Sequence, residues 1–237
     1  MDSSERYSRQ TMLPELGAEG QKRLSATKIL LVGAGGLGSP IATYLTAAGI
    51  GTLGIIDADK VSVSNLQRQT LYTEDEVGQS KVECAYKRLH GLNHEVGIRI
   101  YDCFLTKDNA AEIIAGYDMV VDGCDNFATR FIINDICIAA GKPYIYGSIQ
   151  GLNGQVSVFG VPDASGKVHS YRDLYDESEL LSMEAPSKAV LGITPAVTGS
   201  VEANQVLQLA AGFGEPLIGK LWSIDLRTME SYIIDLP

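Results

Sequence analysis

A glycine-rich turn, placed between an apolar run and a helical pattern, constrains the possible folds of this chain most strongly. Residues 28–36 (KILLVGAGG) are continuously apolar and end in glycines, as expected of a central parallel strand that is covered on both faces. From Leu37 the apolar residues take the spacing of one helix face, and this pattern stops at Gly49 and Gly51. The sequence therefore predicts a strand, a tight turn and a helix in succession.

Strand and helix patterns continue to alternate as far as Gln150. We expect further parallel strands over residues 52–57, 97–103, 117–123 and 143–149. Helices are expected over residues 78–93, 107–116 and 126–140. This alternation indicates an α/β fold with a doubly wound, Rossmann-like, mostly parallel sheet.

Beyond Gln150 the pattern changes to that of antiparallel strands. Further strands are expected over residues 154–160, 220–226 and 230–235, and a helix over 195–211. The segment 161–190 is polar and rich in Asp, Glu, Ser and Pro, which predicts a long crossover loop on the surface. The parallel sheet should therefore continue into antiparallel C-terminal strands.

We predict a single domain, residues 1–237, in three parts. Residues 1–27 form an N-terminal arm with a helix from about Pro14 to Leu24, since proline suits the first turn of a helix. Residues 28–150 form a nucleotide-binding half and residues 151–237 a second half.

The composition is that of a globular protein with an excess of acidic residues. Of the 237 residues 45% are hydrophobic and 20% charged, and the formal net charge is −10, which disfavours nucleic acid as a partner. No run approaches the 18 or so apolar residues of a membrane span, and the polar first residues do not resemble a secretion signal. Scattered cysteines without a CxxC pair are typical of reduced thiols, so we expect a cytoplasmic protein: Cys84, Cys103, Cys124 and Cys137.

The glycine turn has the spacing of a nucleotide-binding fingerprint. Gly33, Gly35 and Gly38 match G-x-G-x-x-G, and Asp57 ends the next predicted strand. Glycines let the backbone approach a phosphate at a helix N-terminus, and Asp57 can accept hydrogen bonds from ribose hydroxyls. We therefore expect a nucleotide site here, the alternative being a tight turn without a ligand.

The loop after the second strand carries groups that suit phosphates. These groups are Asp59, Ser64, Asn65, Arg68, Gln69 and, at the start of the next predicted helix, Lys81. The planar guanidinium of Arg68 matches phosphate oxygens, and Lys81 adds a compact positive charge. Each cation alone is more often a solvated surface charge, but their place beside a glycine turn favours an enzyme that cuts ATP between its phosphates.

A second acidic segment follows the strand predicted over residues 117–123. Asp122 and Asp125 fall at the carboxyl edge, where open α/β sheets bind ligands, and a carboxylate there can hold Mg²⁺ together with substrate phosphates. The alternative is that Asp125 or Asn126 caps the helix that follows.

The histidines give little indication of a metal site. His90 and His94 could share a helix face, but no third ligand is placed to join them, so zinc is not expected there. His169 lies in the polar segment and is expected to be solvated.

Taken together, these segments resemble the ThiF/MoeB/HesA family, the bacterial relatives of ubiquitin-activating enzymes. They are RYSRQ (6–10), GAGGLGS (33–39), D-x-D (57–59), SNLQRQ (64–69), Lys81 and GCDN (123–126). The resemblance extends from Arg6 to about Leu236, is closest to ThiF-type members, and is most specific in SNLQRQ after D-x-D.

The resemblance implies ATP-dependent adenylation of the C-terminal glycine of a small ubiquitin-like sulfur-carrier protein, with release of pyrophosphate. Gly36 and Asp57 would hold the adenosine and ribose, Asn65, Arg68 and Lys81 would gather the phosphates, and Asp125 would bind Mg²⁺. The whole expected site comprises Gly33, Gly35, Gly36, Gly38, Asp57, Asp59, Ser64, Asn65, Arg68, Gln69, Lys81, Asp125 and Asn126.

The resemblance also implies a homodimer. Arg9 of the N-terminal arm would reach into the partner subunit's site, and residues 151–237 would bind the carrier. Where many relatives carry zinc-binding CxxC pairs, this chain has Ser170 and Asp173 in the first and lacks the second, so no zinc is expected. Relatives that bond covalently to their carrier use a cysteine before the VLG segment; residues 185–192 (APSKAVLG) have none, so we expect adenylation alone.

Several functions stay open at this point. A ThiS-like carrier in thiamine thiazole synthesis is the leading interpretation, and a MoaD-like carrier in molybdopterin synthesis is the alternative, because both carriers end in Gly-Gly. An NAD-dependent oxidoreductase would need a second half-site, of which the sequence shows no signature. A binding module without catalysis is disfavoured by the complete set of charged site residues.

Overall fold

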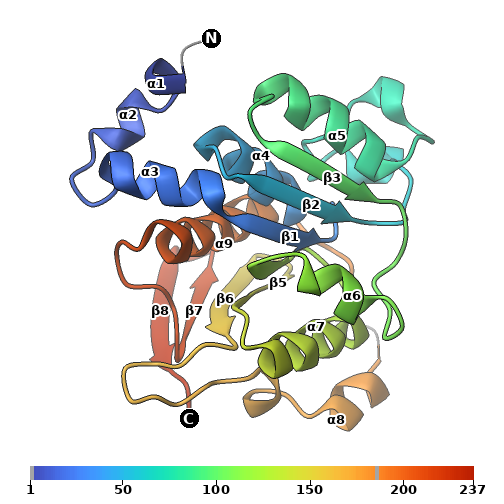
Figure 1. Cartoon of the computed structure of the whole chain (residues 1–237). Coiled ribbons are helices and arrows are strands. Elements are labelled where there is room, and N and C mark those ends of the chain that lie inside the picture. Colours follow the sequence, from blue (N-terminus) through green and yellow to red (C-terminus); the bar gives the residue numbers. More distant parts are fainter. Residues whose placement is uncertain (1–2, 185–186) are drawn as a thin grey trace.

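The computed structural model describes residues 3–184 and 187–237, which fold around one mixed sheet of eight strands in the order β3-β2-β1-β4-β5-β6-β7-β8 (Figure 1). The parallel strands are β1 (Lys28–Val32), β2 (Thr52–Ile56), β3 (Gly97–Tyr101), β4 (Met119–Asp122) and β5 (Tyr144–Gln150). The antiparallel strands are β6 (Asn153–Phe159), β7 (Lys220–Asp225) and β8 (Glu230–Asp235). The predicted change from parallel to antiparallel pairing is confirmed and occurs between β5 and β6.

Among the described residues, the predicted helices are found in order with shifted ends, and the short helices at residues 3–6, 8–11 and 177–182 were not predicted. They are α1 (Ser3–Arg6), α2 (Ser8–Thr11), α3 (Gly17–Ala26), α4 (Gly38–Ala48), α5 (Lys81–Leu92), α6 (Ala110–Ala115), α7 (Phe127–Ala140), α8 (Glu177–Ser182) and α9 (Ile193–Ala211). The helix expected over residues 14–24 is found as α3, which begins three residues later, at Gly17.

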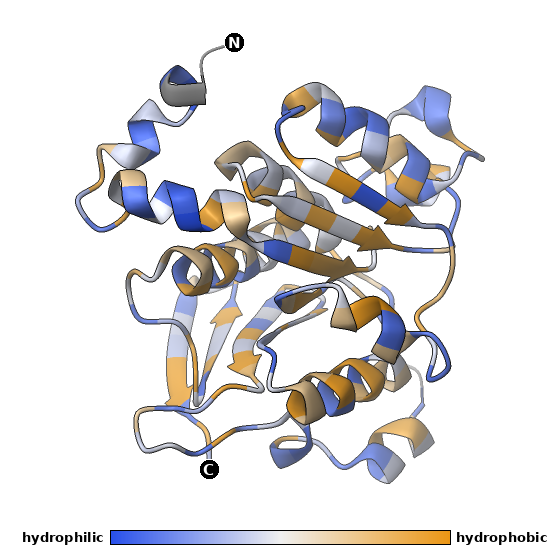
Figure 2. Ribbon diagram, viewed as in Figure 1, coloured by the Kyte–Doolittle hydropathy of each residue, from blue (hydrophilic) through white to orange (hydrophobic). Residues whose placement is uncertain are grey.

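Both faces of the parallel sheet are covered. Along β1, Ile29 and Leu31 face a core formed with α4, α5 and α9, whereas Leu30 and Val32 face a second core formed with α6 and α7. Figure 2 shows the resulting apolar colouring along β1 and β2. This two-sided burial is why the strand sequence is continuously apolar rather than alternating.

The segment 161–190 is more ordered than the sequence predicted. It contains α8 and a short 3-10 turn at Tyr171–Asp173, and the buried Tyr171 donates its backbone N–H to Asn134 Oδ1 on α7 at 2.8 Å. The prediction of a solvated His169 is wrong, because this side chain is only 3% exposed and its Nε2 lies 2.9 Å from Asp163 Oδ2.

Two short stretches lie outside the described residues. They are residues 1–2 and residues 185–186, and the latter begin the APSKAVLG segment in which no cysteine was found. In the part of the chain that is described, no helix combines the length and the apolar character that a membrane span requires.

Candidate nucleotide site

The turn between β1 and α4 is packed so closely that glycine is required. Gly33 has a φ of 94°, and a β-carbon on it would lie 2.5 Å from the carbonyl oxygen of Gly123. A β-carbon on Gly38, at the start of α4, would overlap the carbonyl oxygen of Gly33. The turn thus brings bare backbone to the N-terminus of an eleven-residue helix, which is the form of a phosphate cradle.

Asp57 ties this turn to the loop that follows β2. Its Oδ2 accepts a hydrogen bond from the Ala34 backbone N–H, and its Oδ1 accepts one from the Asp59 backbone N–H, each at 2.8 Å. The Tyr72 hydroxyl donates to the Ala34 carbonyl oxygen at 2.7 Å, and burial raises the pKa of Tyr72, so the hydroxyl remains a donor. Each Asp57 oxygen keeps a further lone pair with which it can accept from a ribose hydroxyl.

The two predicted phosphate-binding cations lie beside the same turn. Lys81, the first residue of α5, extends its Nζ to 2.8 Å from Asp59 Oδ2 and 3.8 Å from Asp57 Oδ2, and its side chain is 5% exposed. Arg68 donates from Nη1 to the Ser64 carbonyl oxygen at 2.9 Å. Its Cδ would lie 3.6 Å from a β-carbon on Gly36, so its side chain passes along the glycine turn.

The SNLQRQ loop is a compact helical turn that brings Arg68 and Gln69 beside the glycine turn. The Asn65 carbonyl oxygen accepts from the backbone N–H groups of Arg68 and Gln69, at 3.0 and 2.9 Å. Gln69 is 4% exposed and lies beside Gly35, and its buried Oε1 has no hydrogen-bond partner within residues 3–184 and 187–237. An unpaired buried amide oxygen against a backbone cradle fits a site that is completed by a polar ligand.

One wall of the site comes from the start of α9, which the sequence analysis did not assign to it. A β-carbon on Gly36 would lie 3.2 Å from two carbons of Pro195, and a β-carbon on Gly192 would overlap the Gln67 carbonyl oxygen. The glycine and proline just before and inside the predicted helix were the only local signals of this contact.

The turn after β4 presents Asp125 at the same edge of the sheet. Asp125 is exposed and makes no hydrogen bond or ion pair with any described residue. Asn126 Oδ1, in contrast, accepts from the Thr129 backbone N–H at 2.9 Å and caps α7. The capping alternative is therefore confirmed for Asn126. The unpaired Asp125 carboxylate fits one ligand of a Mg²⁺ ion whose other ligands are phosphate oxygens and water.

Asp122, which the sequence offered as a second carboxylate at this edge, is not available to a ligand. It is fully buried, and its Oδ2 accepts hydrogen bonds from Arg130 Nε and the Tyr144 hydroxyl, both at 2.9 Å. The prediction failed because Asp122 is the last residue of β4, and its side chain points into the core under α7.

Arg9 lies away from this site in the same chain. It is an exposed residue of α2, and the neighbouring Gln10 donates to the carbonyl oxygen of Ala48 at the C-terminal end of α4. The glycine turn is at the opposite end of this eleven-residue helix, about 16 Å away.

Metal ligands from the protein are sparse. Among the described residues, no three His, Cys, Asp or Glu side chains gather in a group that could hold a metal ion. His90 stacks on Tyr86, with ring centroids 5.6 Å apart.

Comparison with known proteins relates the chain to one group of enzymes by sequence and by fold. The chain is 45% identical over 225 residues to the sulfur carrier protein adenylyltransferase of Thermus thermophilus, which covers 93% of this chain and 83% of that protein. It is 44% identical over 227 residues to the probable adenylyltransferase/sulfurtransferase MoeZ of Mycobacterium tuberculosis, covering 94% of this chain and 58% of MoeZ. The chain thus spans little more than half the length of MoeZ.

A solved structure and a family match agree with these sequences. The crystal structure of E. coli MccB with ATP superposes with a TM-score of 0.80 at 26% identity, covering 98% of this chain and 71% of that chain. Residues 7–236 match the ThiF family. On this evidence of fold, site and sequence, the chain belongs to the ThiF family.

Proposed function

We propose that this chain uses ATP to adenylate the C-terminal glycine of a small ubiquitin-like sulfur-carrier protein. The main support is the convergence of a glycine cradle, Asp57, Arg68 and Lys81 at one edge of the sheet, on the loop that bears SNLQRQ. The Thermus relative is named a sulfur carrier protein adenylyltransferase, and the chain covers most of its length.

The reaction joins two anions. A carboxylate oxygen of the carrier attacks the α-phosphorus of ATP, a new C–O–P bond forms, and the bond to the departing pyrophosphate breaks. No general base is required, because a terminal carboxylate is already ionised at pH 7. The protein must instead stabilise negative charge on the leaving group and align the reactants.

The site residues divide this work. Arg68, Lys81 and Asn65 gather the phosphates beside the glycine turn, and the carboxylates of Asp57 and Asp59 orient the Lys81 ammonium toward that turn. Asp125 would hold Mg²⁺, which supplies additional positive charge to the phosphate oxygens when bound. Losing one contact of this kind typically costs ~3–4 kcal/mol of transition-state stabilisation.

Arg9 is assigned to a second copy of the chain. Since α2 lies at the far end of α4 from the glycine turn, Arg9 can act only in the site of another subunit, which requires a homodimer. Met12 and Leu13 beside it are 72% and 55% exposed, which suits a protein interface.

The carrier is assigned to residues 151–237, and a ThiS-like protein of thiamine thiazole synthesis is the leading candidate. β8 has Tyr232, Ile233 and Ile234 all more than half exposed, a surface that a folded carrier could cover. A MoaD-like carrier of molybdopterin synthesis is the alternative, since the same chemistry serves either Gly-Gly tail.

The direct test is carrier-dependent exchange of labelled pyrophosphate into ATP, with ThiS-like and MoaD-like proteins supplied separately. Exchange with one carrier only supports adenylation and identifies that carrier. Arg68→Ala should abolish the exchange, whereas Arg88→Ala, an exposed arginine of α5, should leave it unchanged. ATP binding without exchange in the presence of either carrier would reject the proposal.

A further inference from the structure

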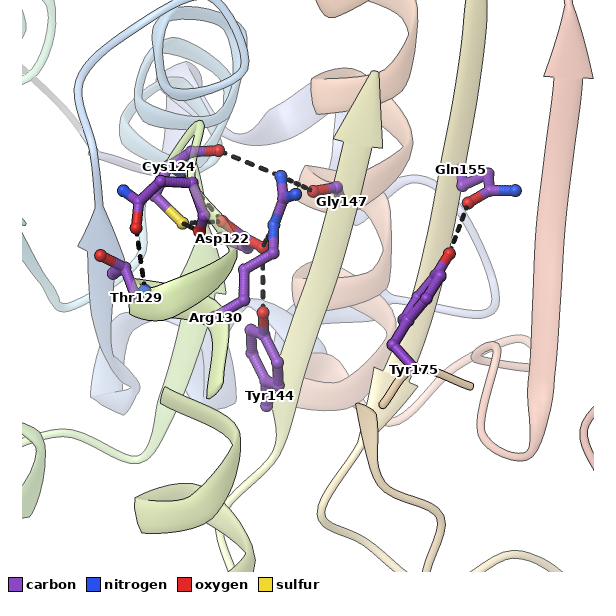
Figure 3. Close-up of polar contacts among 9 residues, drawn as sticks. Asp122, Cys124, Thr129, Arg130, Tyr144, Gly147, Gln155 and Tyr175 are labelled. Atoms are coloured by element: carbon purple, nitrogen blue, oxygen red, sulfur yellow. Dashed lines mark hydrogen bonds and ion pairs between the residues drawn. The ribbon is translucent and has the colours of Figure 1, made fainter. Parts of the chain in front are cut away.

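A buried arginine lies directly behind the turn that bears Asp125. The Arg130 side chain, on α7, is 6% exposed and donates from Nε to Asp122 Oδ2 at 2.9 Å. Its Nη2 donates to two backbone carbonyl oxygens, that of Cys124 at 3.1 Å and that of Gly147 on β5 at 3.0 Å (Figure 3). One guanidinium therefore connects β4, the turn after it and β5.

The same network holds the peptide groups of Cys124 from both sides. Asp122 Oδ1 accepts from the Cys124 backbone N–H at 2.9 Å and from its Sγ at 2.8 Å, while Arg130 binds the Cys124 carbonyl. Asp125 follows at once, and the next residue, Asn126, is fixed as the cap of α7. Asp125 is thus an unpaired carboxylate between Cys124, whose backbone is hydrogen-bonded to Asp122 and Arg130, and Asn126, whose side chain caps α7.

Stability alone does not account for this buried ion pair. Removing two charges from water is costly, and apolar residues of similar volume often stabilise a core equally well or better. The cluster also contains Glu202 of α9, which is fully buried against Gly147 with no partner for either carboxyl oxygen among the described residues. Burial raises the pKa of Glu202 well above its ordinary value and so favours its neutral form. Asp122 is therefore the carboxylate that balances the positive charge of Arg130.

We propose that Arg130 is a positioning residue for the proposed Mg²⁺ ligand: with Asp122 it fixes the turn 122–126 so that Asp125 points at the phosphates. This inference rests on the proposed function, because it concerns how that site binds Mg²⁺ with ATP. Residues that orient a metal ligand typically change metal affinity by about 10- to 100-fold when they are replaced.

The test measures how Mg²⁺ strengthens binding of a non-hydrolysable ATP analogue, by calorimetry at increasing MgCl₂ concentrations. Arg130→Lys should weaken the Mg²⁺ effect by about tenfold or more, because one ammonium nitrogen cannot reproduce the planar fork that reaches Asp122 from Nε and both carbonyls from Nη2. In the double variant with Asp125→Asn, the Mg²⁺ effect should be no smaller than in Asp125→Asn alone, since both changes remove the same Mg²⁺ ligand interaction. Arg172→Lys is the control; Arg172 pairs with Asp135 and Glu177 on the outer side of α7 and does not touch the turn.

A milder variant covers the case in which Arg130→Lys does not fold. Tyr144→Phe removes one hydrogen bond to Asp122 and keeps the ring, so it should weaken the Mg²⁺ effect by about fivefold. Its control is Tyr117→Phe, which removes the hydroxyl of another buried tyrosine, one that hydrogen-bonds to Tyr101 instead of Asp122.

Thiol labelling followed by mass spectrometry reports on the turn without ATP. Cys124 should label faster in Arg130→Lys than in the wild type, while Cys137, buried on α7, should keep its rate.

The outcomes separate the two proposals. If Asp125→Asn weakens the Mg²⁺ effect but neither Arg130→Lys nor Tyr144→Phe does, the positioning role is rejected and the proposed function stands. If Mg²⁺ strengthens binding equally in the wild type and in Asp125→Asn, the assignment of Asp125 fails and the positioning role fails with it. An additive double variant would show that Arg130 affects Mg²⁺-dependent binding independently of Asp125, and would also reject the positioning role.

Discussion

The backbone of Gly33 packs directly against the backbone of Gly123, at the carboxyl ends of the neighbouring strands β1 and β4. A β-carbon on Gly33 would lie 2.5 Å from the Gly123 carbonyl oxygen, and a β-carbon on Gly123 would overlap the Gly33 carbonyl oxygen. Since Val32 and Asp122 are paired in the sheet just before these glycines, the nucleotide turn and the turn bearing Asp125 form one structural unit.

Gly123→Ala should disturb both turns. We expect it to lower the free energy of unfolding by about 1–3 kcal/mol, because a methyl group must displace backbone atoms, and to weaken ATP binding. Denaturant unfolding and ATP titration would measure the two effects. Gly91→Ala is the control: it lies within α5 with open space around it, and should stabilise the protein by about 1 kcal/mol. Wild-type behaviour of Gly123→Ala would contradict the close packing.

Mixed dimers test the assignment of Arg9 to the partner subunit's site. Arg9→Ala and Lys81→Ala should each be inactive in pyrophosphate exchange, and equal mixing should restore about a quarter of the wild-type activity, since half of a random mixture is heterodimer with one intact site. Lys81→Ala mixed with Arg68→Ala should restore none, because both residues belong to the same chain's site. Recovery in that control, or its absence in the first mixture, would reject the shared site.

Glu202→Gln should change how stability depends on pH. The raised pKa of Glu202 means that the folded state favours the proton, so its burial costs stability increasingly as pH rises above the unfolded value of about 4.3. The glutamine of the variant cannot ionise, so its stability should lack this pH dependence. Above about pH 4.3, the variant should become more stable than the wild type by up to about 1.4 kcal/mol for each pH unit. Unfolding measured at pH 4 and pH 8 checks the sign; equal pH dependence in both proteins would contradict a buried neutral acid.

Arg172→Met should reduce the loss of stability in acid. Hydrogen bonds from Arg172 lower the pKa of Asp135, so this pair stabilises the fold above the unfolded pKa of about 4 and is lost as pH falls. Both side chains are more than a third exposed, so the effect should be below about 1 kcal/mol. Unfolding curves at pH 6 and pH 3 give the free energy of unfolding at each pH. The loss of this free energy between pH 6 and pH 3 should be smaller in the variant than in the wild type.

The local pattern predicted the elements of the fold well. Period and glycine placement indicated the strand, turn and helix at residues 28–48, and the change from β5 to β6 was visible as a switch to alternating residues. The segment 161–190 was misjudged because its polar residues bind one another and α7, as Arg172 does with Asp135, which composition cannot reveal.

Within the site, the sequence determined which groups stand beside the glycine turn, because Gly33 and Asp57 directly follow the adjacent strands β1 and β2. Lys81 begins the helix after the next loop, and its ammonium pairs with Asp57 and Asp59. Tertiary structure decided what those groups contact. It buried Asp122 with Arg130, brought Glu202 against Gly147, set Pro195 beside Gly36, and moved Arg9 to the opposite end of α4. Periodicity reports only which face of its own element a residue occupies, whereas these contacts depend on the order of the strands and on the packing of α9 across them.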